Sequence, residues 1–146
     1  MEDPYELERF IQAQRPVYRR VLEELTQGHK RTHWMWYVFP QLRGLGSSAI
    51  ARTYGLESIA EARAYLAHPL LGEHLRQCSR LMLEARGGDA RQILGYPDDL
   101  KLRSCMTLFA SAADDPADQR LFRSVLERYF AGIEDPLTRE LMTSAS

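Results

Sequence analysis

Apolar residues recur three and four positions apart along most of the chain. One such stripe covers residues 7–11, and a second covers residues 17–25, between Pro16 and Gly28. Further stripes occupy residues 71–85, 102–113 and 121–129. Residues spaced in this way share one face of a helix, and an apolar face favours burial. The pattern therefore predicts a series of amphipathic helices joined by short loops.

Helix-start signals accompany these stripes. Asp-Pro pairs stand at residues 3–4, 115–116 and 135–136, and each places a side-chain acceptor before a proline suited to the first helical position. Ser58 and Glu61 have the spacing of a capping box, which marks the start of a further short helix. We therefore expect helices to begin at these four places.

The segment Trp34–Phe39 is too short for its pattern to separate a strand from a buried helix. Thr32 is placed to cap a helical turn there, and Pro40 is placed to end it. No stretch of the sequence shows several strands of period two. We predict an all-α fold in which the whole 146-residue chain forms one compact domain of about seven short helices. Its core is expected over about residues 4–142, followed by a frayed tail, Thr143–Ser146.

Composition and charge narrow the classes of function. Hydrophobic residues make up 45% of the chain and charged residues 27%, which is typical of a globular domain. The net charge of −1 ranks nucleic-acid binding lowest, because nucleic-acid binders usually carry a basic excess. No apolar run is long enough to cross a membrane, and residues 1–4 lack the basic and apolar regions of a signal peptide. We expect a cytoplasmic protein without a membrane partner.

The sequence offers no metal or cofactor motif. Cys78 and Cys105 lie in helical apolar patterns without Cys-x-x-Cys spacing, so we expect free thiols that pack as small apolar groups. His68 and His74 are six residues apart, and neither has a second ligand at a spacing typical of metal sites. No nucleophile elbow, P-loop or dinucleotide fingerprint is present. We therefore predict no metal and no cofactor.

The richest chemistry lies in "GHKRTHWMWYVFPQLRGLGSS", residues 28–48. It contains two sets of residues suited to an anion. Lys30 stands near its start, and Arg43 precedes a glycine-rich turn that leads into an expected helix at residues 49–54. Free backbone N–H groups at a helix start favour an anion, so Gly44, Gly46 and Ser47 join these cations as candidate binding residues. Ser48 is an alternative to Ser47 as the source of a hydroxyl. The alternative is that both glycines only shape a loop and that Ser47 caps the helix.

The same segment carries three aromatic candidates, His33, Trp34 and Trp36. One tryptophan could belong to the core while the other stacks on the ring of a ligand. His33 is a candidate acid–base group because it lies close in sequence to the cations and the glycine turn. The alternative is that all three serve only packing and structure.

The second candidate segment is "PDDLKLRSCMTLF", residues 97–109. Asp98 and Asp99 stand where acidic residues favour a helix start, and Asp98 shares one helix side with Lys101. Lys101 is either a simple exposed partner of Asp98 or a phosphate-binding lysine oriented by it. Asp98 would form an acid–base pair with His33 if the two segments meet in space, which the sequence does not decide. Thr107, further along this helix, is also a candidate ligand-binding residue.

These segments carry a resemblance to a known family. Together with "EARAYLAHPLLGEHL" and "GIEDPLTRELM", they make the chain, from about Leu7 to Leu141, similar to the bacterial and fungal domain-of-unknown-function family numbered 1810. The resemblance implies a compact, mostly helical domain and no assigned activity. Some members carry the label calpastatin, but inhibitors of that type are disordered and polar, whereas this chain is rich in core residues.

Two functional hypotheses follow. In the first, a pocket built from residues 33–36, 43–48 and 98–107 binds a small anionic ligand of nucleotide or ADP-ribose type. Hydrolysis or transfer there would use His33 or Asp98 as acid–base group. In the second, the protein is a non-catalytic interaction domain and the aromatic segment is core or a partner-binding patch. The sequence indicates no oligomeric state.

Overall fold

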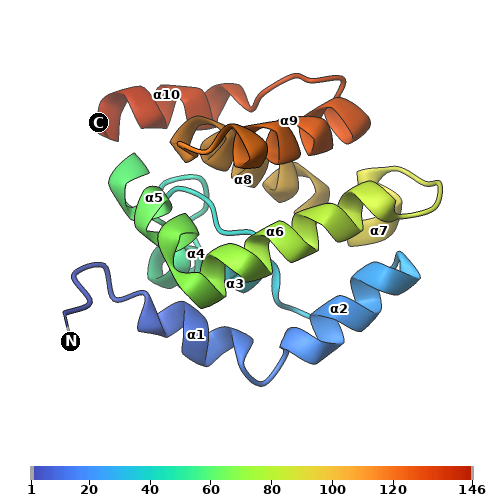
Figure 1. The fold of residues 1–146 in the computed structure, drawn as a ribbon, viewed down its shortest axis with the longest axis horizontal. Coiled ribbons are helices and arrows are strands. Elements are labelled where there is room, and N and C mark those ends of the chain that lie inside the picture. The colour runs from blue at the N-terminus through green and yellow to red at the C-terminus, as the bar shows by residue number, and fades with distance from the viewer. Residues whose placement is uncertain (1, 146) are drawn as a thin grey trace.

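The computed structural model describes residues 2–145 and contains ten α-helices and no β-strand within that range (Figure 1). The helices are α1 (Glu8–Gln14), α2 (Tyr18–Gln27), α3 (Met35–Val38), α4 (Ala49–Tyr54), α5 (Ile59–Ala67), α6 (Pro69–Glu84), α7 (Ala90–Leu94), α8 (Asp98–Ala112), α9 (Pro116–Phe130) and α10 (Pro136–Ala145). Seven of them have seven or more residues, while α3, α4 and α7 are shorter. The prediction of an all-α fold is confirmed.

Helix α6 runs through the middle of the molecule (Figure 1). It packs against α1 and α2 on one side and against α5 and α9 on the other. Helix α8 packs against α5, α7, α9 and α10, and side chains from most of its turns are buried. Cys78 of α6 and Cys105 of α8 lie in this core as free thiols, as the sequence predicts. The core therefore lies where α5, α6, α8 and α9 meet.

Most of the expected helix starts are correct. Ser58 and Asp115 each accept a hydrogen bond from a backbone N–H in the first turn of the following helix. Asp135 accepts one from the N–H of Thr138 at the start of α10. The start of α1 is different, because Glu6 adopts a left-handed backbone with φ of 54°. Asp3 still accepts hydrogen bonds from the N–H groups of residues 7 and 8, but the helix begins only at Glu8.

Three local predictions need correction. The cap of α4 is Ser48, whose hydroxyl accepts a hydrogen bond from the N–H of Ala51, and not Ser47. Thr32 does not cap α3, because its hydroxyl donates to Glu24 instead. Helix α7 was not predicted, since five residues are too few to show a period, although its capping box of Asp89 and Gln92 is complete.

The structure differs from the prediction at the C-terminal end. Helix α10 continues through residue 145, although the sequence predicts a frayed tail from residue 143. Residue 146, the last of the predicted tail, and residue 1 lie outside the described residues. None of the helices in residues 2–145 has the length and apolar character needed to cross a membrane.

Candidate functional site

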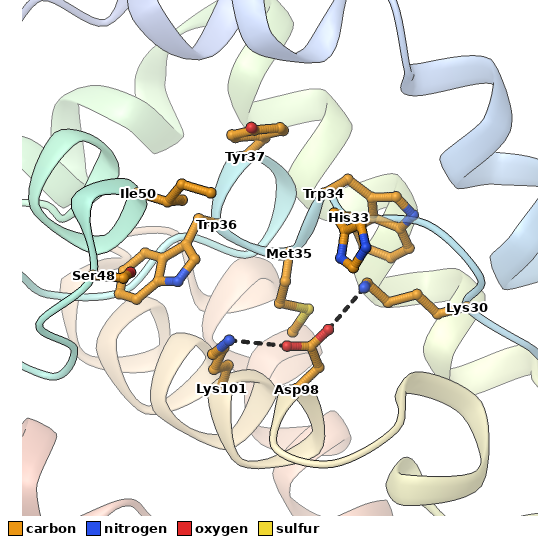
Figure 2. Close-up of a pocket in the computed structure, with 10 residues that line it drawn as sticks. All are labelled: Lys30, His33, Trp34, Met35, Trp36, Tyr37, Ser48, Ile50, Asp98 and Lys101. Atoms are coloured by element: carbon orange, nitrogen blue, oxygen red, sulfur yellow. Dashed lines mark hydrogen bonds and ion pairs between the residues drawn. The ribbon is translucent and has the colours of Figure 1, made fainter.

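Two segments that are far apart in the sequence meet at one carboxylate. The Nζ atom of Lys30, which follows α2, lies 2.7 Å from Oδ2 of Asp98, the first residue of α8. The Nζ atom of Lys101, one turn further along α8, lies 3.0 Å from Oδ1 of the same side chain. Figure 2 shows both contacts beside a cavity. The structure thus brings together the two segments whose proximity the sequence left open.

The cavity has a volume of about 170 Å³ and lies between α3, the loop before it, and the starts of α4 and α8. Its lining residues are Lys30, His33, Trp34, Met35, Trp36, Tyr37, Ser48, Ile50, Asp98 and Lys101. Six of these ten were predicted for the site from the sequence. Because His33 and Ile50 are exposed, the cavity opens to solvent at these side chains.

The loop that carries His33 and Trp34 is held by the buried carboxylate of Glu24 in α2. Its Oε1 atom accepts hydrogen bonds from the N–H of Arg31 at 2.9 Å and from the indole Nε1 of Trp34 at 2.9 Å. The N–H and hydroxyl of Thr32 donate to the same carboxylate. Burial by itself opposes the charge on Glu24, but these donors outweigh it and lower its pKa to about 2. Glu24 is therefore a charged anchor for the loop.

Lys30 is fixed at both its backbone and its side chain. Its backbone N–H donates to the carbonyl of Ile93 in α7 at 2.7 Å. Its side chain is only 7% exposed, with Nζ between Asp98 and the ring of Trp34, whose centroid is 5.1 Å away. A cation over the face of tryptophan is attracted by the ring's quadrupole. The position of this ammonium group is thus set before any ligand arrives.

The charged groups of the cavity leave a positive excess. Burial by itself would raise the pKa of Asp98, but hydrogen bonds and charge from Lys30 and Lys101 outweigh it and lower the pKa. Asp98 is therefore an ionised carboxylate shared by two ammonium groups. Among the lining residues, two positive charges face one negative charge, which favours an anion.

The wall opposite Lys30 is built by α3 and the turn after it. Trp36 is 7% exposed, and a Cβ atom at Gly46 would lie 3.3 Å from its ring, so this glycine permits the turn to pack closely behind the indole. Figure 2 shows the indole nitrogen of Trp36 on the side of Lys101. Within the described residues, the Trp36 nitrogen, the His33 ring and the Tyr37 hydroxyl make no hydrogen bond to the protein. These polar groups are available to a ligand.

A buried polar network holds the backbone of Tyr37. The side-chain amide nitrogen of Gln14 donates to the carbonyl of Tyr37 at 2.6 Å and to the hydroxyl of Tyr65 at 3.0 Å. The Tyr65 hydroxyl also donates to this carbonyl. Since the amide nitrogen of Gln14 is the donor, its oxygen accepts from Nδ1 of His74 at 2.6 Å. Helices α1, α5 and α6 thereby position α3.

Five predicted site residues do not line the cavity. Arg43 forms an ion pair with Glu57 at 2.7 Å, and a Cβ atom at Gly44 would face the side chain of Leu141 in α10. Gly46 and Ser47 are the others on this turn: Gly46 lies behind Trp36, and the carbonyl of Ser47 accepts a hydrogen bond from Arg52.

Thr107 is the fifth, and it is fully buried. Its hydroxyl donates to the carbonyl of Arg103 at 2.8 Å and accepts from the N–H of Asp135 at 2.9 Å. Both of these bonds are internal to the protein. Thr107 thus joins α8 to the start of α10 and stands away from the cavity.

The two tryptophans have different environments. Trp34 is 1% exposed, and its indole N–H is already bonded to Glu24, so it packs in the core and supports Lys30. Trp36 keeps an unpaired N–H at the cavity and is the residue available to a ligand ring. His33 is exposed at the mouth of the cavity.

The sequence did not single out Glu24, Tyr37 or Ile50 for the site. Met35 and Ser48 also line the cavity and lie in the predicted segments 33–36 and 43–48, where Ser48 was an alternative to Ser47. Glu24 carries a detectable signal, because it is an acidic residue next to Leu25 in the apolar stripe of an amphipathic helix. The other four have ordinary side chains whose relevance depends on where α3 and α4 pack. Within the part of the chain that the structure describes, no three His, Cys, Asp or Glu side chains are grouped to hold a metal ion.

Comparisons with known proteins agree with the fold and name no activity. A family model described as "Protein of unknown function (DUF1810)" matches residues 4–142. The crystal structure of the conserved hypothetical protein Rv1873 from Mycobacterium tuberculosis is similar, with 54% sequence identity and a TM-score of 0.93. The similarity covers 97% of this chain and 99% of that one. No curated protein sequence matches the chain.

Proposed function

The chain belongs to the DUF1810 family of proteins of unknown function, and we propose that its cavity binds a small anionic ligand that carries a ring, of nucleotide or ADP-ribose type. The ring would pack against Trp36, and the anionic group would lie against Lys101. Both groups belong to one open cavity of about 170 Å³, so a single small molecule can contact them together.

One observation carries this proposal, namely that Lys30 and Lys101 share the single carboxylate of Asp98. Two cations held beside one anion leave attraction for a further anion. Lys101 is the accessible partner, because its side chain is 29% exposed while that of Lys30 is 7% exposed.

For a hydrolysis or transfer reaction in this cavity, we assign the acid–base role to His33. A general base works best when its pKa is near the operating pH, whereas the two lysines lower the pKa of Asp98. Asp98 instead orients the two ammonium groups. The His33 ring has no hydrogen-bond partner within the described residues and stands at the mouth of the cavity, where a ligand would reach it.

The proposal is tested by thermal unfolding of the purified protein with AMP, ADP-ribose, NAD and ribose 5-phosphate. A ligand present at about 100 times its dissociation constant stabilises the folded state by about 2.7 kcal/mol, which raises the melting temperature by several degrees. We expect such a shift with at least one of these compounds. It should be lost in Lys101→Ala and His33→Ala and kept in Arg43→Ala, which changes a cation outside the cavity.

The opposite outcome is equally clear. If all variants fold and none of the compounds shifts the melting temperature of the wild-type protein, the cavity is not a site for this class of ligand. We would then favour the alternative function, a non-catalytic interaction domain. A shift that is retained in Lys101→Ala and His33→Ala would place binding elsewhere on the molecule.

A further inference from the structure

We infer that the part of the ligand enclosed by the cavity is a single planar ring that carries one negative charge, as a carboxylate or a phosphodiester does. This inference rests on the proposed function and narrows its substrate class. It excludes a phosphomonoester dianion as the enclosed group. Within the thermal panel it therefore assigns the shift to ADP-ribose or NAD, whose phosphates each carry one charge, and not to AMP or ribose 5-phosphate. The remainder of such a larger ligand lies outside the cavity. Three features of the cavity lead to this inference, namely its charge, its volume and its hydrogen-bond donors.

The charge of the cavity matches a monoanion. Lys30 and Lys101 contribute two positive charges and Asp98 one negative charge, so these three groups together have a net charge of +1. A single negative charge brings this total to zero. The desolvation cost of an ion grows with the square of its charge, whereas its attraction to a fixed charge grows linearly. The second unit of charge on a dianion therefore adds more desolvation cost than the first unit, while it adds no more attraction than the first.

The volume of the cavity matches one ring. A protein cavity of about 150 Å³ holds a benzene molecule. The cavity described here has about 170 Å³, so it encloses one ring with its substituent and no complete dinucleotide. Met35, Trp36 and Ile50 line it with apolar surface suited to the faces of such a ring.

Hydrogen-bond donors with remaining capacity lie along the edge where the charged group would stand. The indole nitrogen of Trp36 has no partner within the described residues and lies on the Lys101 side of its ring (Figure 2). An ammonium group and an indole N–H can both donate to the oxygens of one carboxylate or phosphodiester. The two indole groups of the protein differ here, because that of Trp34 is already bonded to Glu24.

The test uses five simple probes in NMR titrations of the full chain at a pH of about 8. Phenyl phosphate has a second pKa of about 6, so it is a dianion at this pH. Benzoate and methyl phenyl phosphate each carry a ring and one charge, benzamide has the ring without charge, and acetate has the charge without a ring. The readout is the indole N–H signal of Trp36, identified by its loss in Trp36→Phe. The signal of Trp34 serves as an internal reference.

In the wild-type protein, benzoate or methyl phenyl phosphate should bind at least about tenfold more tightly than phenyl phosphate, benzamide and acetate, as expected when one charged hydrogen bond is gained or lost. Comparison of benzoate with methyl phenyl phosphate then tells whether a carboxylate or a phosphodiester is preferred. Each titration should move the signal of Trp36 and leave that of Trp34 in place.

Two variants change the charge of the cavity in opposite directions. Asp98→Asn raises the net charge to +2 and should shift the preference to phenyl phosphate by about tenfold. Lys101→Gln lowers the net charge to zero and should shift the preference to benzamide. Lys101→Gln leaves the pair of Lys30 and Asp98 intact, so it tests the inference even if Asp98→Asn does not fold. Arg43→Gln, which removes a charge outside the cavity, should change no preference.

The outcomes separate this inference from the proposed function. If the ring compounds move the Trp36 signal but their order of affinity does not follow the net charge, the inference about charge fails while the binding site stands. If phenyl phosphate binds most tightly to the wild-type protein, the monoanion is wrong. If no probe moves the signal and the nucleotides also cause no thermal shift, the proposed function itself fails.

Discussion

Residues of the same chemical type play different roles in this protein. Thr107 and Ser48 are both small hydroxyl residues in the two candidate segments. The hydroxyl of Thr107 is fully buried and joins Arg103 of α8 to Asp135 before α10. Ser48 lines the cavity while capping α4. At this scale, the partner of each polar atom decides between a structural and a binding role.

Thr107→Val is expected to reduce the free energy of unfolding by about 1–2 kcal/mol without changing ligand binding. Valine has nearly the same shape but offers no acceptor, so the half-buried N–H of Asp135 loses its partner. Urea denaturation measures the loss, and thermal shifts with the ligand panel measure binding. Thr107→Ser keeps the hydroxyl and should retain most of the stability. If a folded Thr107→Val protein loses the ligand-induced shift in melting temperature, Thr107 contributes to ligand binding and the prediction is wrong.

Among the elements, the loop before α3 and α3 itself build the cavity wall, and side chains and carbonyl groups of neighbouring helices fix both of them in place. The loop between α2 and α3 is fixed by the carboxylate of Glu24 at one point and by the carbonyl of Ile93 in α7 at another. Helix α3 is a single turn, and the Gln14 amide holds its Tyr37 carbonyl. Elements too short to be stable alone thus take their positions from longer neighbours.

Glu24→Gln is expected to reduce the free energy of unfolding by about 2 kcal/mol, because four hydrogen bonds to a buried carboxylate lose their charged acceptor. The amide nitrogen of glutamine would also face donors where an oxygen stood. Since His33 and Trp34 lie on this loop, the ligand-induced thermal shift should decrease as well.

The matched control is Glu23→Gln, which changes the neighbouring exposed carboxylate. Urea denaturation followed by tryptophan fluorescence compares the two variants. Equal stability of Glu24→Gln and Glu23→Gln would show that Glu24 does not anchor the loop.

At the scale of the whole molecule, a polar network connects helices that are distant in the sequence. His74 of α6 stacks on Tyr18 of α2 with ring centroids 3.5 Å apart, and it hydrogen-bonds to Gln14 of α1. Gln14 in turn bonds to Tyr65 of α5 and to the carbonyl of Tyr37 in α3. Five helices therefore meet around side chains whose polar atoms must all be paired.

His74 gives this network a pH dependence. Burial lowers the pKa of His74, and the nearby charge of Glu73 opposes this only in part. Below its ordinary pKa of about 6.5 the unfolded chain binds more protons than the folded protein, so the free energy of unfolding decreases as the pH falls. The contribution of His74 is complete above that pH and is lost as the pH falls from there to the lower folded pKa.

We expect the wild-type protein to lose stability between about pH 7.5 and about pH 5.5, and His74→Gln to lose less over the same interval. Urea denaturation at a series of pH values measures the difference. His29→Gln, at an exposed histidine, should keep the wild-type slope. Equal slopes for His74→Gln and the wild-type protein would contradict the role of His74.

Local sequence predicted most of the helices because caps and periodicity depend on residues within one or two turns. Gly28 ends α2 in a left-handed conformation, and Asp115 caps α9, as their positions in the sequence indicate. The sequence did not predict α7, whose five residues show no period, or the delayed start of α1, which follows from the backbone of Glu6. Short elements and single backbone angles depend on packing beyond the local pattern.

Local patterns along the chain are enough to predict an all-helical fold and two segments with the cations, aromatic rings and carboxylate of a candidate anion site. The packing of the helices places Lys30 against Asp98 and Trp36 at the cavity, and it pairs the polar groups of Trp34 and Thr107 with other parts of the protein. The reason is physical: periodicity and capping act over a few residues, whereas these contacts depend on how separate helices pack around a shared core.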